Sequence, residues 1–237
     1  MIFLYLLSGH WLLIAAAILP ALFLVRTVYR ADRLEKESPR MIGTLIVFGI
    51  ISTVIAMVLE YIGSMLLEGI EKSDPGLWRV LMYFGVVAFS EEGAKYFLLR
   101  RRTWRNPEFN CQFDGVVYAV SVSLGFALWE NIGYAARYGL STALLRALTA
   151  VPGHACFGVF MGVWYGAAKR FHRLGDARMK RLCGVFSVLI PAVLHGTYDY
   201  LATAQTNHEW TFIVFVAAMF LYAWRTVRKR AEKDRYI

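Results

Sequence analysis

Long apolar runs separated by short polar segments dominate this chain. A helix needs ~20 apolar residues to cross the hydrocarbon core of a bilayer, and most of these runs reach that length. The run at 211–224 is short for a span. The pattern predicts an all-α, polytopic membrane protein of about seven transmembrane helices. The expected helices cover residues 2–25, 42–67, 78–99, 113–136, 144–168, 182–204 and 211–224.

Composition supports a membrane protein. The chain has 237 residues, of which 58% are hydrophobic, and its mean hydropathy is +0.47. Soluble domains are nearer 45–50% apolar. We therefore expect one integral membrane domain over residues 1–237, in contact with the lipid bilayer. The three cysteines form no CxxC pair, so a disulfide framework or a cysteine metal site is not expected, and Cys156 is expected to be a small buried residue.

The basic residues predict an orientation. Residues 26–40, 100–105, 169–181 and 225–237 hold 21 of the 26 Lys and Arg residues. Each of these segments follows an odd-numbered predicted helix, so the positive-inside rule places the N-terminus outside and the basic C-terminal tail in the cytoplasm. The net charge of +9 would suggest nucleic acid in a soluble protein. Here membrane topology and lipid headgroups explain it, and no nucleic-acid partner is expected.

Two adjacent acids, Glu91 and Glu92, lie inside the otherwise apolar run at 78–99. Charged groups are costly at membrane depth, so one carboxylate must be protonated, paired or hydrated. Lys95 follows Glu91 by four residues and Glu92 by three, and can reach either acid on a helix. One alternative is an ion pair that only joins two helices. Because a pair needs a single acid, the second carboxylate remains available as a general base.

The next predicted helix contains Glu130, with Phe126 one turn before it and Asn131 directly after it. Glu130 is a candidate site residue, although a lone acid near an interface can also be a snorkelling or helix-packing group. Asp114 opens this helix, and we expect it to be a cap or hydrogen-bond anchor.

Two further helices contribute histidines. His154 begins the series His154, Gly158, Gly162, Gly166, whose spacing of four marks a face against which another helix packs closely. His154 is therefore expected to point into the bundle. His195 and Asp199 lie one turn apart, as in a metal-ligand pair or a histidine oriented by a carboxylate. The other histidines are expected in loops or at the interface: His10, His172 and His208.

These side chains form one combined candidate site, with a catalytic core at about 78–204. They match the residues needed to hydrolyse a peptide bond with an activated water. Straight parallel helices would place Glu91 ~20 Å and Asp199 ~5 Å from the outer face, too far apart for one site. We therefore expect the helix over 78–99 to start deeper than its hydropathy indicates. The candidate catalytic residues are Glu91, Glu92, Glu130, His154, His195 and Asp199, supported by Lys95, Phe126, Asn131 and Asp114.

Four motifs together resemble a known family. SEEGAK resembles an EExxK motif, FALWEN an FxxxEN motif, PGHACFG a histidine-bearing helix and HGTYD an HxxxD motif, in this order across residues 90–200. This combination resembles the PrsW family of intramembrane proteases, which is distantly related to the CAAX-prenyl endopeptidase and bacteriocin-immunity families. The resemblance implies a multi-pass protease of the bacterial plasma membrane. It also implies a single-pass membrane substrate, such as an anti-sigma factor cut first on its extracytoplasmic side in stress signalling.

Two mechanisms fit the residues. In one, His154 and His195, with Glu130 or Asp199, hold a divalent metal such as Zn²⁺. In the other, Glu91 or Glu92 activates water without a metal and the histidines stabilise the oxyanion.

Other functions also remain open. A proton-coupled membrane transporter would collect similar groups, but it would usually show internal repeats, which this chain lacks. A CAAX-like endopeptidase is the nearest enzymatic alternative, and the FxxxE pattern in place of FxxxH argues against it.

Overall fold

The computed structural model describes residues 11–203 and 209–237, and these residues form helices joined by short turns. Within these ranges the β-bridge between Cys111 and Tyr236 is isolated. The all-α prediction is confirmed. The elements are α2 (Trp11–Ala31), α3 (Pro39–Ser73), α4 (Pro75–Val80), the π-helix η1 (Leu81–Ala88), α5 (Phe89–Thr103), α6 (Asp114–Tyr138), α7 (Leu140–Leu148), α8 (Ala150–Arg173), α9 (Ala177–Ala202) and α10 (Glu209–Glu232).

Six of the described helical segments are long and apolar enough to cross a membrane, which confirms a polytopic membrane protein. The helix expected over 78–99 is not among them, because it belongs to the composite stretch α4–η1–α5. The helix expected over 211–224 is longer than predicted, since α10 has 24 residues. The start of the helix expected at 2–25 lies outside the described residues, as do His10 and His208.

Helix α6 lies at the centre of the packing, between α3 and α8. A Cβ atom on Gly162 of α8 would collide with the backbone of Gly115 and Val116. Likewise, a Cβ atom on Gly125 of α6 would collide with the backbone of Ile46 in α3. Glycine at these positions lets the helix backbones approach closely. The close packing predicted from the glycine series is thus confirmed, and α6 is the partner helix.

Local signals define several helix starts. Ser38 accepts a hydrogen bond from the Met41 N–H at the start of α3, and Pro39 follows as the first helical residue. Asp74 accepts a hydrogen bond from the Leu77 N–H at the turn between α3 and α4. The chain therefore reverses sharply at Asp74 and forms an antiparallel pair of helices.

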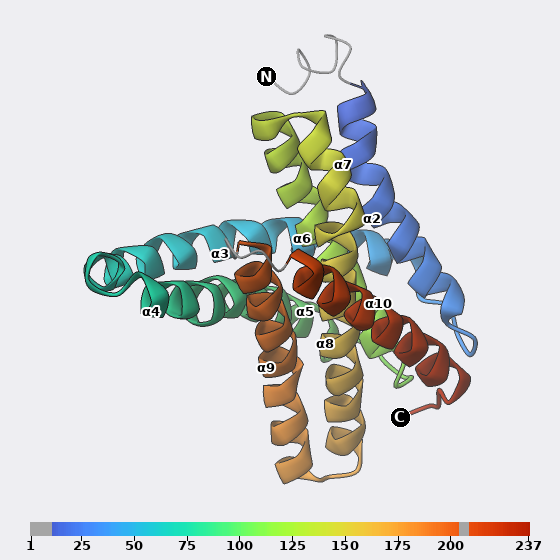
Figure 1. Cartoon of the computed structure of the whole chain (residues 1–237). Coiled ribbons are helices and arrows are strands. Elements are labelled where there is room, and N and C mark those ends of the chain that lie inside the picture. Colours follow the sequence, from blue (N-terminus) through green and yellow to red (C-terminus); the bar gives the residue numbers. More distant parts are fainter. Residues whose placement is uncertain (1–10, 204–208) are drawn as a thin grey trace.

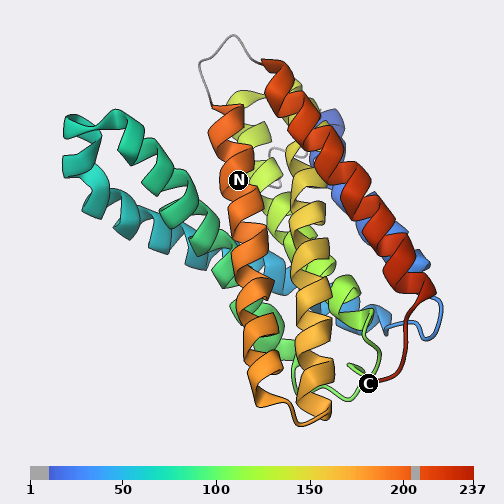
Figure 2. The same cartoon turned by 60° about the horizontal axis from the view of Figure 1, so that its bottom comes forward.

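That pair forms an arm that extends away from α8 and α9 (Figures 1 and 2). Its helices do not run parallel to α8 and α9, so a residue count along α4–η1–α5 does not measure depth. The helical stretch begins at Pro75, and the deeper start expected from the sequence is wrong. Helix α5 reaches the centre of the bundle because the arm, which includes the π-helix η1, is inclined to α8 and α9.

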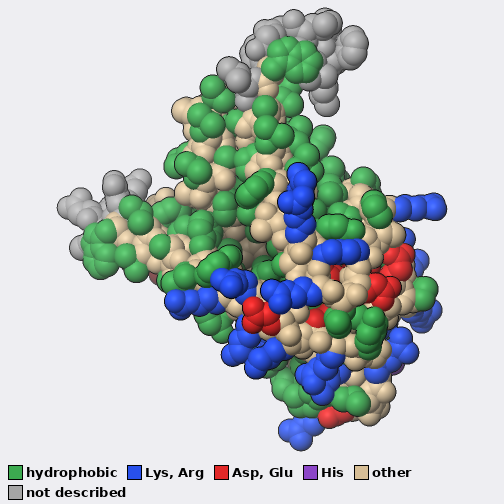
Figure 3. Space-filling view, turned by 90° about the vertical axis from the view of Figure 1, so that its right-hand side faces the viewer, with side chains coloured by type: hydrophobic (Ala, Val, Ile, Leu, Met, Phe, Trp, Pro, Cys, Tyr) green, Lys and Arg blue, Asp and Glu red, His purple; other side chains and the backbone are tan. Residues whose placement is uncertain are grey.

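Basic side chains gather on one part of the surface, while the upper part of the same view is largely apolar (Figure 3). Residues 26–40, 100–105, 169–181 and 225–237 lie at helix ends that carry most of the Lys and Arg residues. We call these four segments the basic face.

Candidate functional site

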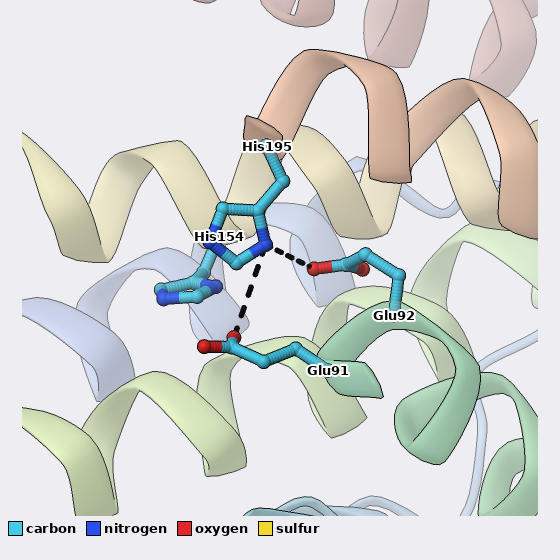
Figure 4. Close-up of side chains that lie close together, drawn as sticks. All are labelled: Glu91, Glu92, His154 and His195. Atoms are coloured by element: carbon cyan, nitrogen blue, oxygen red, sulfur yellow. Dashed lines mark hydrogen bonds and ion pairs between the residues drawn. The ribbon is translucent and has the colours of Figure 1, made fainter. Parts of the chain in front are cut away.

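Glu91 and Glu92 of α5, His154 of α8 and His195 of α9 converge at the centre of the protein. Each offers one ligand atom, and these atoms all lie within 4.8 Å of one another. Figure 4 shows the two carboxylates approaching the ring of His195, with His154 beside it. All four residues are buried. The large difference in membrane depth that straight helices would give these residues is therefore absent.

Lys95 links the acids to His154. Its Nζ donates to Glu92 Oε1 at 2.8 Å and to Glu91 Oε2 at 3.1 Å, and it lies 3.1 Å from His154 Nδ1. The same ammonium lies 3.8 Å from the centroid of the Phe126 ring. Because Lys95 is fully buried, these contacts replace its lost hydration.

The contacts of His154 indicate its tautomer. An ammonium can only donate, so His154 Nδ1 accepts the hydrogen bond from Lys95. His154 Nε2 then carries the proton and donates to Glu130 Oε2 at 2.9 Å. The same carboxylate oxygen lies 2.8 Å from Arg146 of α7. Glu130 therefore orients His154 and is itself held by Arg146.

His195 lies between two acidic groups. Its Nδ1 is 3.0 Å from Glu92 Oε1 and 3.8 Å from Glu91 Oε2, and its Nε2 is 3.4 Å from Asp199 Oδ2. Phe157 stacks on the ring with centroids 4.7 Å apart and planes 20° apart. Because both ring nitrogens face carboxylates, and one face is covered by Phe157, the orientation of His195 is well defined.

A cavity of about 350 Å³ opens onto this cluster and is lined by residues including Glu91, His154, His195 and Asp199. A second cavity of about 520 Å³ lies between α3 and α6. Both are lined by Glu60, Glu91, Glu130 and Tyr134, so the two spaces meet there. Glu92 is absent from the described linings and is fully buried. Of the two adjacent acids, Glu91 faces the space that a substrate can enter.

Two of the expected supporting residues lie away from this cluster. Asn131 donates from Nδ2 to the carbonyl of Ala17 at 3.4 Å and so contacts α2. Asp114, at the other end of α6, accepts hydrogen bonds from the N–H groups of Asn110 and Cys111. Asp114 is thus the hydrogen-bond anchor that the sequence predicted.

Three residues at the site were not predicted from the sequence. Glu60 of α3 lines both cavities, Arg146 pairs with Glu130 and Phe157 stacks on His195. The sequence contains an indication of Glu60 as a site residue, because Glu60 is an acid within the apolar run at 42–67. Arg146 is one of few cations outside the basic face, whereas Phe157 is one apolar residue among many.

The residues fit a divalent metal by their chemistry. Two imidazoles and two carboxylates are ligands that Zn²⁺ accepts, and Glu92 Oε2 is buried without a hydrogen-bond partner among the described residues. This group differs from the ligand set expected from the sequence. Glu91 and Glu92 belong to it, whereas Glu130 and Asp199 each contact one histidine from outside it. The Lys95 ammonium contacts three of the same four residues, so a metal ion here would replace those contacts.

Comparison with known proteins identifies the family. Residues 37–224 match the family described as PrsW family intramembrane metalloprotease. Protease PrsW of Bacillus subtilis (strain 168) is 33% identical over 225 residues, which cover 95% of this chain and 96% of that protein. Protease PrsW of Geobacillus kaustophilus (strain HTA426) is 33% identical over 94% of this chain and 93% of that protein. No solved structure matches the chain. This multi-pass bacterial membrane protein therefore belongs to the PrsW family of intramembrane proteases.

Proposed function

We propose that this protease cleaves single-pass membrane proteins near their extracytoplasmic side with a water molecule activated by Glu91. The observation that carries the proposal is the position of Glu91. Its carboxylate lines the cavity, while its Oε2 atom accepts a hydrogen bond from Lys95. A general base needs both contact with the reacting water and a fixed orientation, and Glu91 has both features.

Glu92 acts as a positioning residue in this proposal. Its Oε1 atom contacts Lys95 at 2.8 Å and His195 at 3.0 Å, from a fully buried position. Glu92 therefore holds the ammonium and the imidazole in place. This assignment gives the two adjacent acids different roles: Glu91 takes the proton and Glu92 orients the groups around it.

The reaction that these residues support is direct hydrolysis. Glu91 removes a proton from water while the water oxygen forms a bond to the carbonyl carbon of the peptide. The resulting oxyanion accepts a hydrogen bond from His195 Nε2, which lies at the cavity and has only a long 3.4 Å contact with Asp199. Glu91 then returns the proton to the amide nitrogen as the C–N bond breaks. His154 also lines the cavity, where Glu130 accepts its Nε2 proton and fixes its orientation.

A metal ion is compatible with this arrangement. His154, His195, Glu91 and Glu92 are the residues that would hold it, and its chemistry when bound is to polarise the scissile carbonyl and acidify a bound water.

The location of the site supports cleavage on the extracytoplasmic side. Glu130 is 16 residues from the start of α6, and His195 is 18 residues from the start of α9. Helix α9 starts within the basic face, and α6 starts beside it, because the Phe113 N–H donates to Asp234 of the 225–237 segment. These side chains therefore lie roughly 25 Å along the helix axes from the basic face. With the basic face in the cytoplasm, the site lies in the outer part of the membrane.

The second cavity suggests how a substrate reaches Glu91. It lies between α3 and α6, and its lining residues Met57, Trp129 and Tyr138 are exposed at the apolar surface. A membrane-spanning segment could approach along this groove without leaving the bilayer. An anti-sigma factor, the substrate implied by the sequence resemblance, has this chemistry: a single apolar span followed by an extracytoplasmic chain.

The test is a cleavage assay with the full protein in liposomes and a single-pass membrane protein as substrate. We expect one cut near the extracytoplasmic end of the span, located from the fragment masses, and no cut with Glu91→Gln. Glu68→Gln is the matched control, because Glu68 is an acid in an exposed ion pair with Lys72 on the arm. A cut in a cytoplasmic lipidated tail would instead indicate a CAAX-like endopeptidase. Proton-coupled transport without cleavage would indicate a transporter.

A further inference from the structure

A second buried group of acids lies at the opposite end of α6 from Glu130. Asp32 follows α2, Glu37 precedes α3 and Asp114 begins α6. Each contributes one carboxylate oxygen to a group whose members lie within 4.8 Å of one another. The three residues are only 2%, 5% and 1% exposed. The connection between α2 and α3 and the start of α6, which are far apart in the sequence, therefore bring negative groups together in a buried space.

Several of these oxygens have no hydrogen-bond partner among the described residues. Both carboxylate oxygens of Asp32 and the Oδ1 atom of Asp114 are buried and unpartnered. The other atoms are bonded: Asp114 Oδ2 accepts two backbone N–H groups, and Glu37 Oε2 accepts the Tyr118 hydroxyl at 2.6 Å. Buried carboxylate oxygens without partners are costly. The unpartnered atoms therefore indicate a missing positive ligand.

The neighbouring cations form no described hydrogen bond to these unpartnered oxygens. The Lys36 ammonium donates to the backbone carbonyls of Tyr29, Arg30 and Asp32 at the end of α2, and makes none of its described hydrogen bonds to a carboxylate. Arg33 pairs with Glu232 at 3.9 Å on the exposed surface. The acids thus lie beneath a basic surface without a side-chain cation bonded to the unpartnered oxygens.

A fourth acid adds to the local negative charge. Asp234, in the residues after α10, has a buried and unpartnered Oδ2 atom, and lies within 4.8 Å of Asp114 as part of a second group with Cys111. Its Oδ1 atom accepts a hydrogen bond from the Phe113 N–H at 2.8 Å. The C-terminal residues are therefore attached to the same loop that begins α6.

We propose that Asp32, Glu37 and Asp114 bind a hard divalent cation of the Mg²⁺ and Ca²⁺ class. The donors are carboxylate oxygens, which these cations prefer, and histidine is absent from the group. The cation satisfies the unpartnered oxygens and reduces the repulsion from Asp234. It also joins the end of α2, the start of α3 and the start of α6. This site is separate from the proteolytic cluster and does not depend on the proposed function.

Protons are the competing ligands at this site. Burial raises the pKa of Asp32, and burial together with the nearby Asp114 raises the pKa of Glu37 to about 9. Without a divalent cation, Glu37 therefore retains its proton near neutral pH. The two alternatives differ in their response to added cation, and this response is measurable.

The experiment measures thermal unfolding of the full protein in detergent with a chelator, with Mg²⁺ or with Ca²⁺. For the wild-type protein, we expect an increase in Tm of at least about 3 °C at saturating concentration of one cation. Asp32→Asn is the main variant, because asparagine keeps the size of the side chain and one acceptor oxygen while it removes the negative charge. Glu232→Gln is the matched control, since it removes one acid from the exposed surface nearby.

We expect Glu232→Gln to respond to the cation like the wild type, and Asp32→Asn to lose most of the shift while unfolding no earlier in chelator. Glu37→Gln is a second variant, in which the side-chain amide can still accept from Tyr118. Two results would overturn the proposal: no shift in the wild type with either cation, or an undiminished shift in both Asp32→Asn and Glu37→Gln. An undiminished shift would place the cation elsewhere, including at the proteolytic cluster.

Discussion

The Nζ atom of Lys95 lies 3.1 Å from Nδ1 of His154 and connects α5 to α8 inside the protein. The same ammonium bonds to both adjacent acids. Lys95 therefore balances one of the two negative charges of the acidic pair, and it also fixes which nitrogen of His154 carries the proton. Charge balance and histidine orientation depend on one side chain.

The first prediction concerns Lys95. Lys95→Met removes the ammonium and leaves Glu91 and Glu92 buried beside each other without a cation. Breaking a buried ion pair in this way costs about 3–5 kcal/mol. We expect a marked loss of thermal stability together with loss of cleavage, measured by Tm and by the liposome assay. A stable and active Lys95→Met protein would show that the acids do not need this cation.

The second prediction concerns Arg146, which lies 2.8 Å from Glu130. Arg146→Gln leaves the contact between Glu130 and His154 in place but removes the group that holds Glu130. Loss of a group that orients a site residue through a hydrogen bond typically lowers activity 10–100-fold. We therefore expect a loss of about tenfold in kcat/KM with little change in folding. Lys72→Gln is the control, because its ion pair on the arm is exposed. Equal activity of the two variants would exclude Arg146 from orienting the site.

The third prediction concerns the contact between α6 and α8. A Cβ atom on Gly162 would collide with the backbone of Gly115 and Val116, whereas a Cβ atom on Gly43 would meet nothing within 4 Å. Alanine is normally favoured over glycine in a helix by about 0.5–1 kcal/mol. We therefore expect Gly162→Ala to lower Tm and Gly43→Ala to leave it unchanged or raise it. The reverse order would contradict the close packing.

Most helices could be predicted from the sequence because apolar length is set by the thickness of the bilayer. The inward position of His154 could also be predicted, since the glycine series marks a packed face. The direction of the α3–α4 arm could not, because hydropathy reports whether a segment is apolar and not its inclination. Glu91 and Glu92 occupy distinct positions because of the tertiary packing around α5. Two adjacent glutamates in a sequence give no information about that packing. Glu60 was missed because a single acid in an apolar run had no recognisable partner in the sequence.

The central claim is that Glu91 activates the water and Glu92 positions the groups around it. The most direct measurement compares single-turnover cleavage by Glu91→Gln and Glu92→Gln, with substrate binding and Tm measured on the same preparations. We predict that Glu91→Gln binds substrate and keeps wild-type Tm, yet cleaves at least about 10³-fold more slowly. We predict that Glu92→Gln lowers Tm and cleavage together, because its contacts with Lys95 and His195 are weakened. Cleavage by Glu91→Gln at near the wild-type rate would contradict the account.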